Sequence, residues 1–449
     1  MYQIVTQRDE KYIQMTGTPV SRLVCRFAVP AIVSMLISSI YNIVDTFFAG
    51  RLDTQSVAAL GVVFSYMSII QACAFFFGQG SGNFISRALG ARKYAEAETM
   101  ASTGFIFSII FSVLMAAICG VFIRPVLTLF GATPTVLPGA VSYYKWILVG
   151  TPFIVGTFVL NNQMRFQGNA RYAVWGILSG ALLNIMLDPL LMFGCGLGVE
   201  GAGLATAVSQ SCSFFLMLYL SGKGGGIRIR LRRFSPSLQI FKEISAGGLP
   251  SLARQGLQAV AVMVLNHCAG AYGDSSLAAF AIVGRVMHIA AAMVIGFGQG
   301  FQPVCGFNYG AKLYDRVRCG IRFCVLLSTL WCLLMTMIGE IFAPEIISIF
   351  TKGDAEVLTL GARVLRAQCL AFPLVGFITI TNMYLQSTRQ VWPALTIAVA
   401  RHGLFLIPAL LVGALFGLRG IVAAQPVSDV LTFLLALPLC LRAVQKMKN

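Results

Sequence analysis

Long apolar runs dominate the chain, and each is about as long as a helix that crosses a lipid bilayer. Runs of roughly 20 apolar residues bounded by charged residues, Gly or Pro predict membrane-spanning helices. This criterion predicts two sets of six helices, the first at 22–50, 56–80, 97–121, 138–163, 172–195 and 199–221, and the second at 244–270, 276–304, 319–342, 357–386, 391–414 and 419–441. The pattern therefore predicts an all-α integral membrane protein with about twelve transmembrane helices.

The composition agrees with a membrane protein. Of 449 residues, 57% are hydrophobic and 11% are charged, and the mean hydropathy is +0.81, whereas a soluble domain carries roughly 25% charged residues. The 12 cysteines are scattered without a C-x-x-C pair, so we expect neither a disulfide framework nor a zinc site. The first 20 residues lack an apolar core and a small-residue cleavage site, so we expect no removable signal peptide.

The net charge of +17 reflects topology, because the basic residues fall in alternate loops. They concentrate at 87–93, 165–171, 223–242, 312–322, 389 and 442–448, while the opposite loops hold mainly Arg51, Arg124, Lys352 and Arg419. Since positive loops remain in the cytoplasm, we expect both termini and the central connector to be cytoplasmic. The sequence thus predicts a multi-pass protein of the cytoplasmic (inner) membrane and no nucleic-acid partner.

The second half of the chain repeats the first at a spacing of 220 residues. Pro30 pairs with Pro250 at this spacing, and the segment "FFFGQGSGN" (75–83) pairs with "IGFGQGFQP" (295–303) without a gap. Two six-helix halves in the same orientation form a parallel repeat, which is typical of secondary transporters. We therefore predict an amino-terminal lobe at 1–221, a basic linker at 222–243 and a carboxyl-terminal lobe at 244–449. The shared G-Q-G motifs predict helix packing or local unwinding.

Polar residues present in only one half must serve something other than the shared scaffold. Four such residues occur in the first half at a similar depth, namely Asp45, Asn184, Asp188 and Thr206. Their counterparts in the second half are Leu265, Gly403, Ile407 and Gln425. At 1.5 Å per residue, Asp45, Asp188 and Thr206 lie roughly 7–10 Å inside the outer ends of their helices. Asn184 and Asp188 are four residues apart and thus share one helical face.

Two carboxylates at this depth are costly unless a cation neutralises them. Either a proton occupies one carboxylate, or oxygen atoms of Asp45, Asn184, Asp188 and Thr206 hold a Na⁺ ion. A structural alternative is that each acid bonds to a backbone group left open by a proline such as Pro189. The sequence therefore predicts a site for Na⁺ or H⁺ and leaves the choice between the two ions open.

Other features carry weaker signals. No role is assigned to the remaining polar residues of the spans, which are Arg254, His267, Arg285, His288, Arg401, His402 and Asp429. The chain has no G-x-x-x-x-G-K-[ST] motif and no soluble segment long enough for separate chemistry. We expect a protein that is not an enzyme and needs no cofactor.

These motifs resemble those of the multidrug and toxic compound extrusion (MATE) transporters, most closely the bacterial multidrug exporters. The resemblance rests on "IYNIVDTFFAG" in the first helix, "GQGSGNFISRALGARKYAEAE" after the second and "LLNIMLDPLLMFGCGLGVEGAGLATAVSQ" across the fifth and sixth. It implies export of cationic, lipophilic compounds driven by Na⁺ or H⁺, and it matches Asp45, Asn184, Asp188 and Thr206 to the family's cation site. It also implies that Asn161 and Tyr143 line the substrate cavity.

The sequence departs from another branch of this family, which carries acids in the seventh and tenth helices. We predict a monomeric antiporter in contact with lipid, in which cation binding at Asp45 and Asp188 bends or repacks the first helix. A second interpretation is a flippase for lipid-linked oligosaccharides, which Arg254, Arg285 and Arg401 would favour if they lined one cleft. A third is a membrane-embedded enzyme that acts on lipid. The substrate and the coupling ion remain open.

Overall fold

All regular secondary structure that the computed structural model describes is helical. The description covers residues 2–351 and 354–448 and leaves out the side chains of residues 2–7, 38–43, 45, 46, 54 and 448. Eleven helices in this part are long and apolar enough to cross a membrane, which confirms the predicted all-α membrane protein. The remaining predicted span is α9 (Leu238–Gly270), which has 33 residues but is less apolar because Arg254, Gln255 and Gln258 interrupt it.

One compact unit contains residues 1–18 and 33–252. Its helices are α1 (Tyr2–Gly17), the second part of α2 (Val20–Ala49), α3 (Thr54–Gly90), α4 (Tyr94–Val121), α5 (Ile123–Leu129), α6 (Leu137–Phe166), α7 (Ala170–Pro189), α8 (Gly198–Ser221) and the first part of α9. The Asp53 carboxylate caps α3 by accepting a hydrogen bond of 2.6 Å from the Ser56 amide. Tyr66 on α3 and Tyr144 on α6 pack edge to face in the core, with ring centroids 4.8 Å apart.

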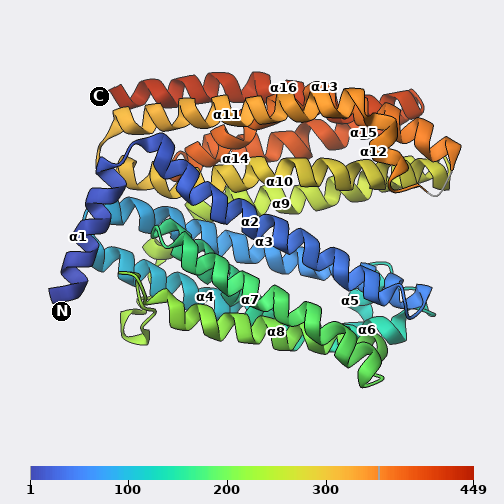
Figure 1. Ribbon diagram of the computed structural model, residues 1–449, viewed down its shortest axis with the longest axis horizontal. Helices are drawn as coiled ribbons and strands as arrows, with labels where there is room; N and C mark the ends of the chain where they lie inside the picture. Colours follow the sequence, from blue (N-terminus) through green and yellow to red (C-terminus); the bar gives the residue numbers. More distant parts are fainter. Residues whose placement is uncertain (1, 352–353, 449) are drawn as a thin grey trace. The chain divides into compact units, whose positions relative to one another are not determined.

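The other unit contains residues 19–32 and 253–449. Its helices are the first part of α2, the second part of α9, α10 (Asp274–Gly310), α11 (Tyr314–Ile341), α12 (Ala343–Ser348), α13 (Ala355–Ser387), α14 (Val391–Val399), α15 (Ile407–Leu415) and α16 (Leu418–Gln445). Figure 1 shows α10, α11, α13 and α16 running alongside one another. A π-helical segment, η3 (Ala400–Leu406), joins α14 to α15. The core of this unit includes Val364, Leu365 and Cys369 on α13.

The backbone preserves the repeat seen in the sequence. Arg92 and Lys312, which are 220 residues apart, both have φ of 60° in the turns after α3 and α10. The short helices α5 and α12, which the hydrophobic pattern does not predict, also correspond at this spacing. Since left-handed backbone is uncommon in residues other than glycine, its recurrence at equivalent positions supports two structurally related halves.

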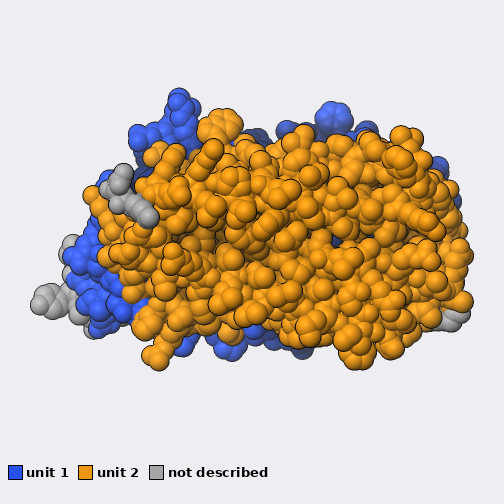
Figure 2. Space-filling model, turned by 90° about the horizontal axis from the view of Figure 1, so that it is seen from above, with its two compact units in different colours: residues 1–18, 33–252 blue, residues 19–32, 253–449 orange. Residues whose placement is uncertain are grey.

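Helices α2 and α9 each divide between the two units at equivalent points of the repeat. The divisions fall between Ile32 and Val33 and between Leu252 and Ala253, each two residues after a proline shared by the halves. Figure 2 shows the two units in different colours. The structure therefore differs from the predicted boundaries, because residues 19–32 cluster with the second half of the chain and residues 222–252 with the first.

Glycines account for this exchange of segments. A Cβ atom on Gly80 of α3 would collide with the carbonyl oxygen of Ile244 in the first part of α9. A Cβ atom on Gly300 of α10 would likewise collide with the backbone nitrogen of Ala28 in the first part of α2. Both G-Q-G motifs lie within unbroken α-helices. The motifs therefore serve close helix packing, and the predicted alternative of local unwinding is wrong.

The polar start of the chain forms α1, an element that the hydrophobic pattern does not predict. The guanidinium group of Arg8 pairs with Glu98 of α4 at 2.7 Å, and Arg92 lies over the ring of Tyr12 at 4.1 Å. Lys11 Nζ donates a hydrogen bond of 2.6 Å to Asn169 Oδ1. These polar contacts hold α1 to the start of α4 and to the loops that follow α3 and α6.

Lys11 gives the stability of this unit a pH dependence. Burial and, to a smaller extent, the nearby Arg8 lower the pKa of Lys11 from 10.5 to about 7. Between pH 7 and pH 10.5 the unfolded chain therefore binds a proton that the folded chain has lost, so the contribution of Lys11 to stability rises with pH across this window. We expect Lys11→Met to flatten the rise of the apparent melting temperature with pH. Lys93→Met, which changes an exposed lysine, should keep the wild-type slope, and equal slopes in all three proteins would contradict the expectation.

Candidate functional site

Two of the predicted cation ligands lie together at the end of α7. Asn184 and Asp188 are both fully buried, each with an exposed fraction of 0%. Asn184 Nδ2 donates a hydrogen bond of 3.3 Å to Asp188 Oδ1, as expected for residues four apart on one helical face. The structure thus confirms that α7 places an amide and a carboxylate side by side in the membrane-spanning part of the protein.

The backbone changes form directly after Asp188. Pro189 has no N–H group, so it cannot continue the α-helical hydrogen-bond pattern. The next residues form the π-helical segment η1 (Leu190–Gly194). Single π-helical turns inside α-helices occur frequently at functional sites. The carboxylate of Asp188 therefore lies at an irregular point of the helix.

Thr206 on α8 lies at the level of Asn184 and Asp188 on α7. Contacts along the two helices fix an antiparallel register: Gly176 faces Ser213, Gly180 faces Ser209 and Ser213, and Leu191 faces Gly201. Because Thr206 lies one turn from Ser209 and Asn184 one turn from Gly180, this register brings Thr206 to the depth of the α7 pair. Its side chain is buried, with an exposed fraction of 1%.

Two oxygen atoms at this level have no hydrogen bond within the described residues. They are Asn184 Oδ1 and Thr206 Oγ1, and both are buried. A buried polar atom without a partner costs about 1–3 kcal/mol. Together with the Asp188 carboxylate, these atoms provide a carboxylate, an amide oxygen and a hydroxyl, which are ligands that hard cations prefer.

Asp45 belongs to α2, but its side chain lies outside the described residues. Its pairing with Asp188 therefore stays a prediction. All twelve cysteines are free in the structure. Among the side chains that the structure describes, no group of three or more His, Cys, Asp or Glu is arranged to hold a metal ion.

The other two predicted residues lie on α6 and are buried. Asn161 Nδ2 donates a hydrogen bond of 3.1 Å to the Ala173 carbonyl, and Asn382 of the second half makes the equivalent bond of 2.7 Å to Ala394. Recurrence in both halves favours a role for Asn161 in the scaffold. Tyr143 is part of the hydrophobic core, with an exposed fraction of 3%. Their predicted place in a substrate cavity stays a prediction.

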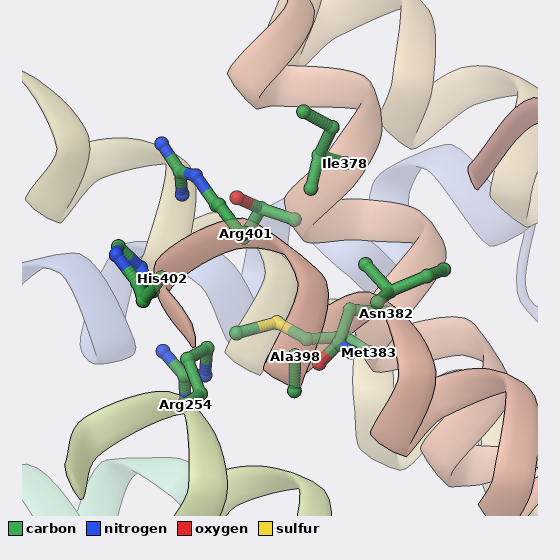
Figure 3. Close-up of a pocket in the computed structure, with 9 residues that line it drawn as sticks. Arg254, Ile378, Asn382, Met383, Ala398, Arg401 and His402 are labelled. Carbon is green, nitrogen blue, oxygen red and sulfur yellow. The ribbon is translucent and has the colours of Figure 1, made fainter. Parts of the chain in front are cut away.

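A second group of polar residues, to which the sequence assigned no role, lines a pocket in the other unit. We call it the basic pocket, and its lining residues are Arg254 of α9, Ile378, Thr379, Asn382 and Met383 of α13, Ile397 and Ala398 of α14, and Arg401 and His402 of η3. Figure 3 shows the nitrogen-bearing ends of Arg254, His402 and Arg401 on one side of the pocket. Sequence spacing could not reveal it, because Arg254 lies nearly 150 positions before the other two.

One of the two arginines is paired. Arg401 Nε donates to Asp429 Oδ1 at 2.8 Å, and Gln425 Nε2 donates to Asp429 Oδ2 at 3.1 Å. Ser428 Oγ donates to the Arg401 carbonyl at 2.6 Å. Asp429 is buried, with an exposed fraction of 4%. The carboxylate therefore has partners on both oxygens and is committed to Arg401 and Gln425.

Comparisons with known proteins place the chain in a family. The sequence profile of the MatE family matches residues 30–190 and 250–412, which is more than half of the chain. The multidrug export protein MepA of Staphylococcus haemolyticus is 26% identical over 436 residues, covering 96% of this chain and 95% of the relative.

Solved structures share the fold. A MOP superfamily transporter from Pyrococcus furiosus, described with the words "Reverse polarity of binding pocket suggests different function", superposes with a TM-score of 0.90 and 25% identity over 97% of this chain and 98% of its own. An outward-facing multidrug resistance MATE family transporter superposes with a TM-score of 0.90 and 24% identity, with the same coverage. The chain therefore belongs to the MatE family, the multidrug and toxic compound extrusion transporters.

Proposed function

We propose that the protein is a secondary active multidrug efflux antiporter that exports cationic, lipophilic compounds in exchange for Na⁺ or H⁺. The observation that carries this proposal is the buried group of Asp188, Asn184 and Thr206, in which two oxygen atoms have no hydrogen bond within the described residues. The multidrug export activity named for the MepA relative supports the same function. Asp45 completes the proposed site from α2.

The chemistry of the site explains the exchange. A carboxylate in the membrane interior needs a positive charge nearby, and a coupling cation or a cationic substrate meets this need equally well. Binding of Na⁺ or H⁺ neutralises Asp188 and weakens the attraction of its lobe for a cationic substrate. Because the two cations compete for the same negative charge, uptake of one favours release of the other. Movement of α2 through Asp45 is part of this proposal.

The membrane orientation follows from the distribution of charge. The protein would lie in the inner membrane with both termini in the cytoplasm, since basic residues occupy the loops on that side. The polar contacts of Arg8, Lys11 and Tyr12 in α1 with unit-1 loops agree with an aqueous surface there. We propose that the protein functions as a monomer in contact with lipid.

A flippase for lipid-linked oligosaccharides is a second candidate, which one observation favours. Two of the three arginines expected to line one cleft, Arg254 and Arg401, line the basic pocket. The third, Arg285, is exposed and does not line it. The antiporter accounts for the acidic group on α7 as well, so we retain it as the first proposal.

Dye uptake into everted membrane vesicles tests the proposed function. The vesicle lumen then corresponds to the outside of the cell, so a cation leaving the lumen should drive a cationic dye into it. A Na⁺ gradient and a pH gradient are imposed separately, each with the lumen at higher cation concentration. We expect at least one gradient to drive uptake, which identifies the coupling ion. Absence of uptake with both gradients would overturn the antiporter.

A further inference from the structure

The basic pocket is small, and its lining combines charged and apolar side chains. Its cavity volume is about 20 Å³, which is room for about one water-sized group. Ile378, Met383 and Ile397 supply apolar walls. The pocket can therefore hold a small ion or the charged end group of a larger molecule, and the rest of such a molecule must lie outside it.

The charges around the pocket do not balance. The lining residues of α13 and α14 are uncharged, and Asp429 of α16 is committed to Arg401 and Gln425. Arg254 of α9 has no ion pair within the described residues, and its buried Nε has no hydrogen-bond acceptor there. The positive charge of Arg254 is thus not neutralised by a described acidic side chain. An unpaired charge in a membrane-embedded helix bundle is energetically costly.

His402 adds a second buried nitrogen atom that has no hydrogen bond to a described residue. Its side chain has an exposed fraction of only 7%, and its Nδ1 atom makes no hydrogen bond to a described residue. Figure 3 places His402 between Arg254 and Arg401. A neutral imidazole can donate one hydrogen bond, so His402 can supply a donor next to the unbalanced charge.

The repeat shows that these groups are an addition to the scaffold. In the first half, the positions equivalent to Arg254, Arg401 and His402 are occupied by Ser34, Leu182 and Leu183. The first half instead carries Asp45 and Asp188, whose counterparts are apolar. The unpaired basic group of Arg254 and the imidazole of His402 thus occur in the second half alone, although Asn161 and Asn382 keep the same scaffold hydrogen bond in both halves.

We propose that the basic pocket is an anion site that binds a carboxylate or another oxyanion of similar size. Arg254 supplies the charge and bidentate donors that suit a planar carboxylate, and His402 supplies a neutral donor. Arg401, held by Asp429, adds the remaining N–H groups at the edge of the pocket. The site is separate from the cation site on α7 and does not depend on it.

Anion binding to the purified full-length protein tests the proposal. Chloride is replaced stepwise by benzoate at constant pH, ionic strength and Na⁺ concentration. Occupancy of the cation site by Na⁺ or H⁺ therefore stays the same. Thermal stability and titration calorimetry are measured on wild type, Arg254→Gln, Arg254→Lys and Arg285→Gln. Arg285 is the matched control, because it is an arginine of the same unit outside the pocket.

We expect benzoate to raise the apparent melting temperature of wild type and Arg285→Gln. Arg254→Gln should lose this rise and bind benzoate at least about tenfold more weakly, while Arg254→Lys should keep part of it because the charge remains. In chloride, Arg254→Gln should be at least as stable as wild type, since an unpaired charge has been removed. An equal benzoate response in wild type and Arg254→Gln, or an equal loss in Arg285→Gln, would overturn the proposal.

Transport of a matched dye pair identifies the source of the anion. The pair is a cationic rhodamine methyl ester and its free acid, which is a zwitterion. If Arg254→Gln slows export of the acid alone, the carboxylate that binds in the pocket belongs to the transported compound. If export of both dyes is unchanged, the pocket binds a free anion. Slower export of the acid alone supports the anion site directly, and unchanged export of both dyes assigns the pocket to a free anion when Arg254→Gln has lost the benzoate response. Equal slowing of both dyes would contradict the site. Arg254→Gln should still export the cationic dye when a cation gradient is imposed. This measurement distinguishes a failure of the anion site from a failure of the antiporter.

Discussion

Replacing Asp188 by Asn is expected to reduce cation-driven export to about a tenth of the wild-type rate or less. Asn has nearly the same shape and can still accept the hydrogen bond from Asn184 Nδ2, so the helix should fold normally. It cannot take up a proton, and its neutral oxygen is a weaker ligand for Na⁺ than a carboxylate. A loss of at least about 1.4 kcal/mol of cation binding corresponds to a tenfold loss of coupling.

The measurement is dye uptake into everted vesicles that contain equal amounts of each variant. Asp315→Asn provides the control, because this acid is highly exposed and pairs with Arg318 at the start of α11. We expect Asp315→Asn to transport like wild type. Near-normal export by Asp188→Asn at wild-type expression would remove Asp188 from the coupling mechanism.

The second large effect is expected at Gly80, where a single methyl group should destabilise the protein. The Cβ atom of Gly80→Ala would collide with the Ile244 carbonyl oxygen and lie 3.0 Å from the carbonyl carbon, and backbone atoms cannot move aside as a flexible side chain can. Overpacking of this kind costs about 1–3 kcal/mol. At about 2–4 °C per kcal/mol for a unit of this size, the apparent melting temperature should fall by several degrees.

Two further variants make this prediction specific. Gly61 lies on the same helix, and a Cβ atom there would meet nothing within 4 Å. Gly61→Ala should therefore leave the melting temperature unchanged or raise it, because Ala is about 1 kcal/mol better than Gly in a helix. Gly300→Ala, at the equivalent position of the repeat, should destabilise as Gly80→Ala does. Equal melting temperatures for Gly61→Ala and Gly80→Ala would show that the contact with α9 is not as close as described.

The hydrophobic pattern predicted the long helices and the repeat because both depend on periodic features of the sequence. The pairing of Asn184 with Asp188 was predictable for the same reason, since a spacing of four residues fixes one helical face. The level of Thr206 agreed with the prediction because α7 and α8 are consecutive and antiparallel. Local rules thus suffice where the residues lie on one helix or on neighbouring helices.

Tertiary packing explains what the sequence did not reveal. The exchange of residues 19–32 and 222–252 between the units depends on contacts of Gly80 and Gly300 with backbone far away in sequence. The basic pocket is assembled from four helical segments, so neither Arg254 nor His402 stood out alone. α1 escaped prediction because its sequence contains no long apolar run.

Cation countertransport shows whether Asp188 couples cation flux to dye flux. Purified protein is reconstituted into vesicles loaded with Na⁺ or with acidic buffer, and cation efflux is recorded after a cationic dye is added outside. We expect dye entry to release the coupling cation in a fixed ratio in wild type, and we expect Asp188→Asn to show neither flux. Dye entry without cation efflux in wild type, or undiminished countertransport in Asp188→Asn, would contradict this expectation.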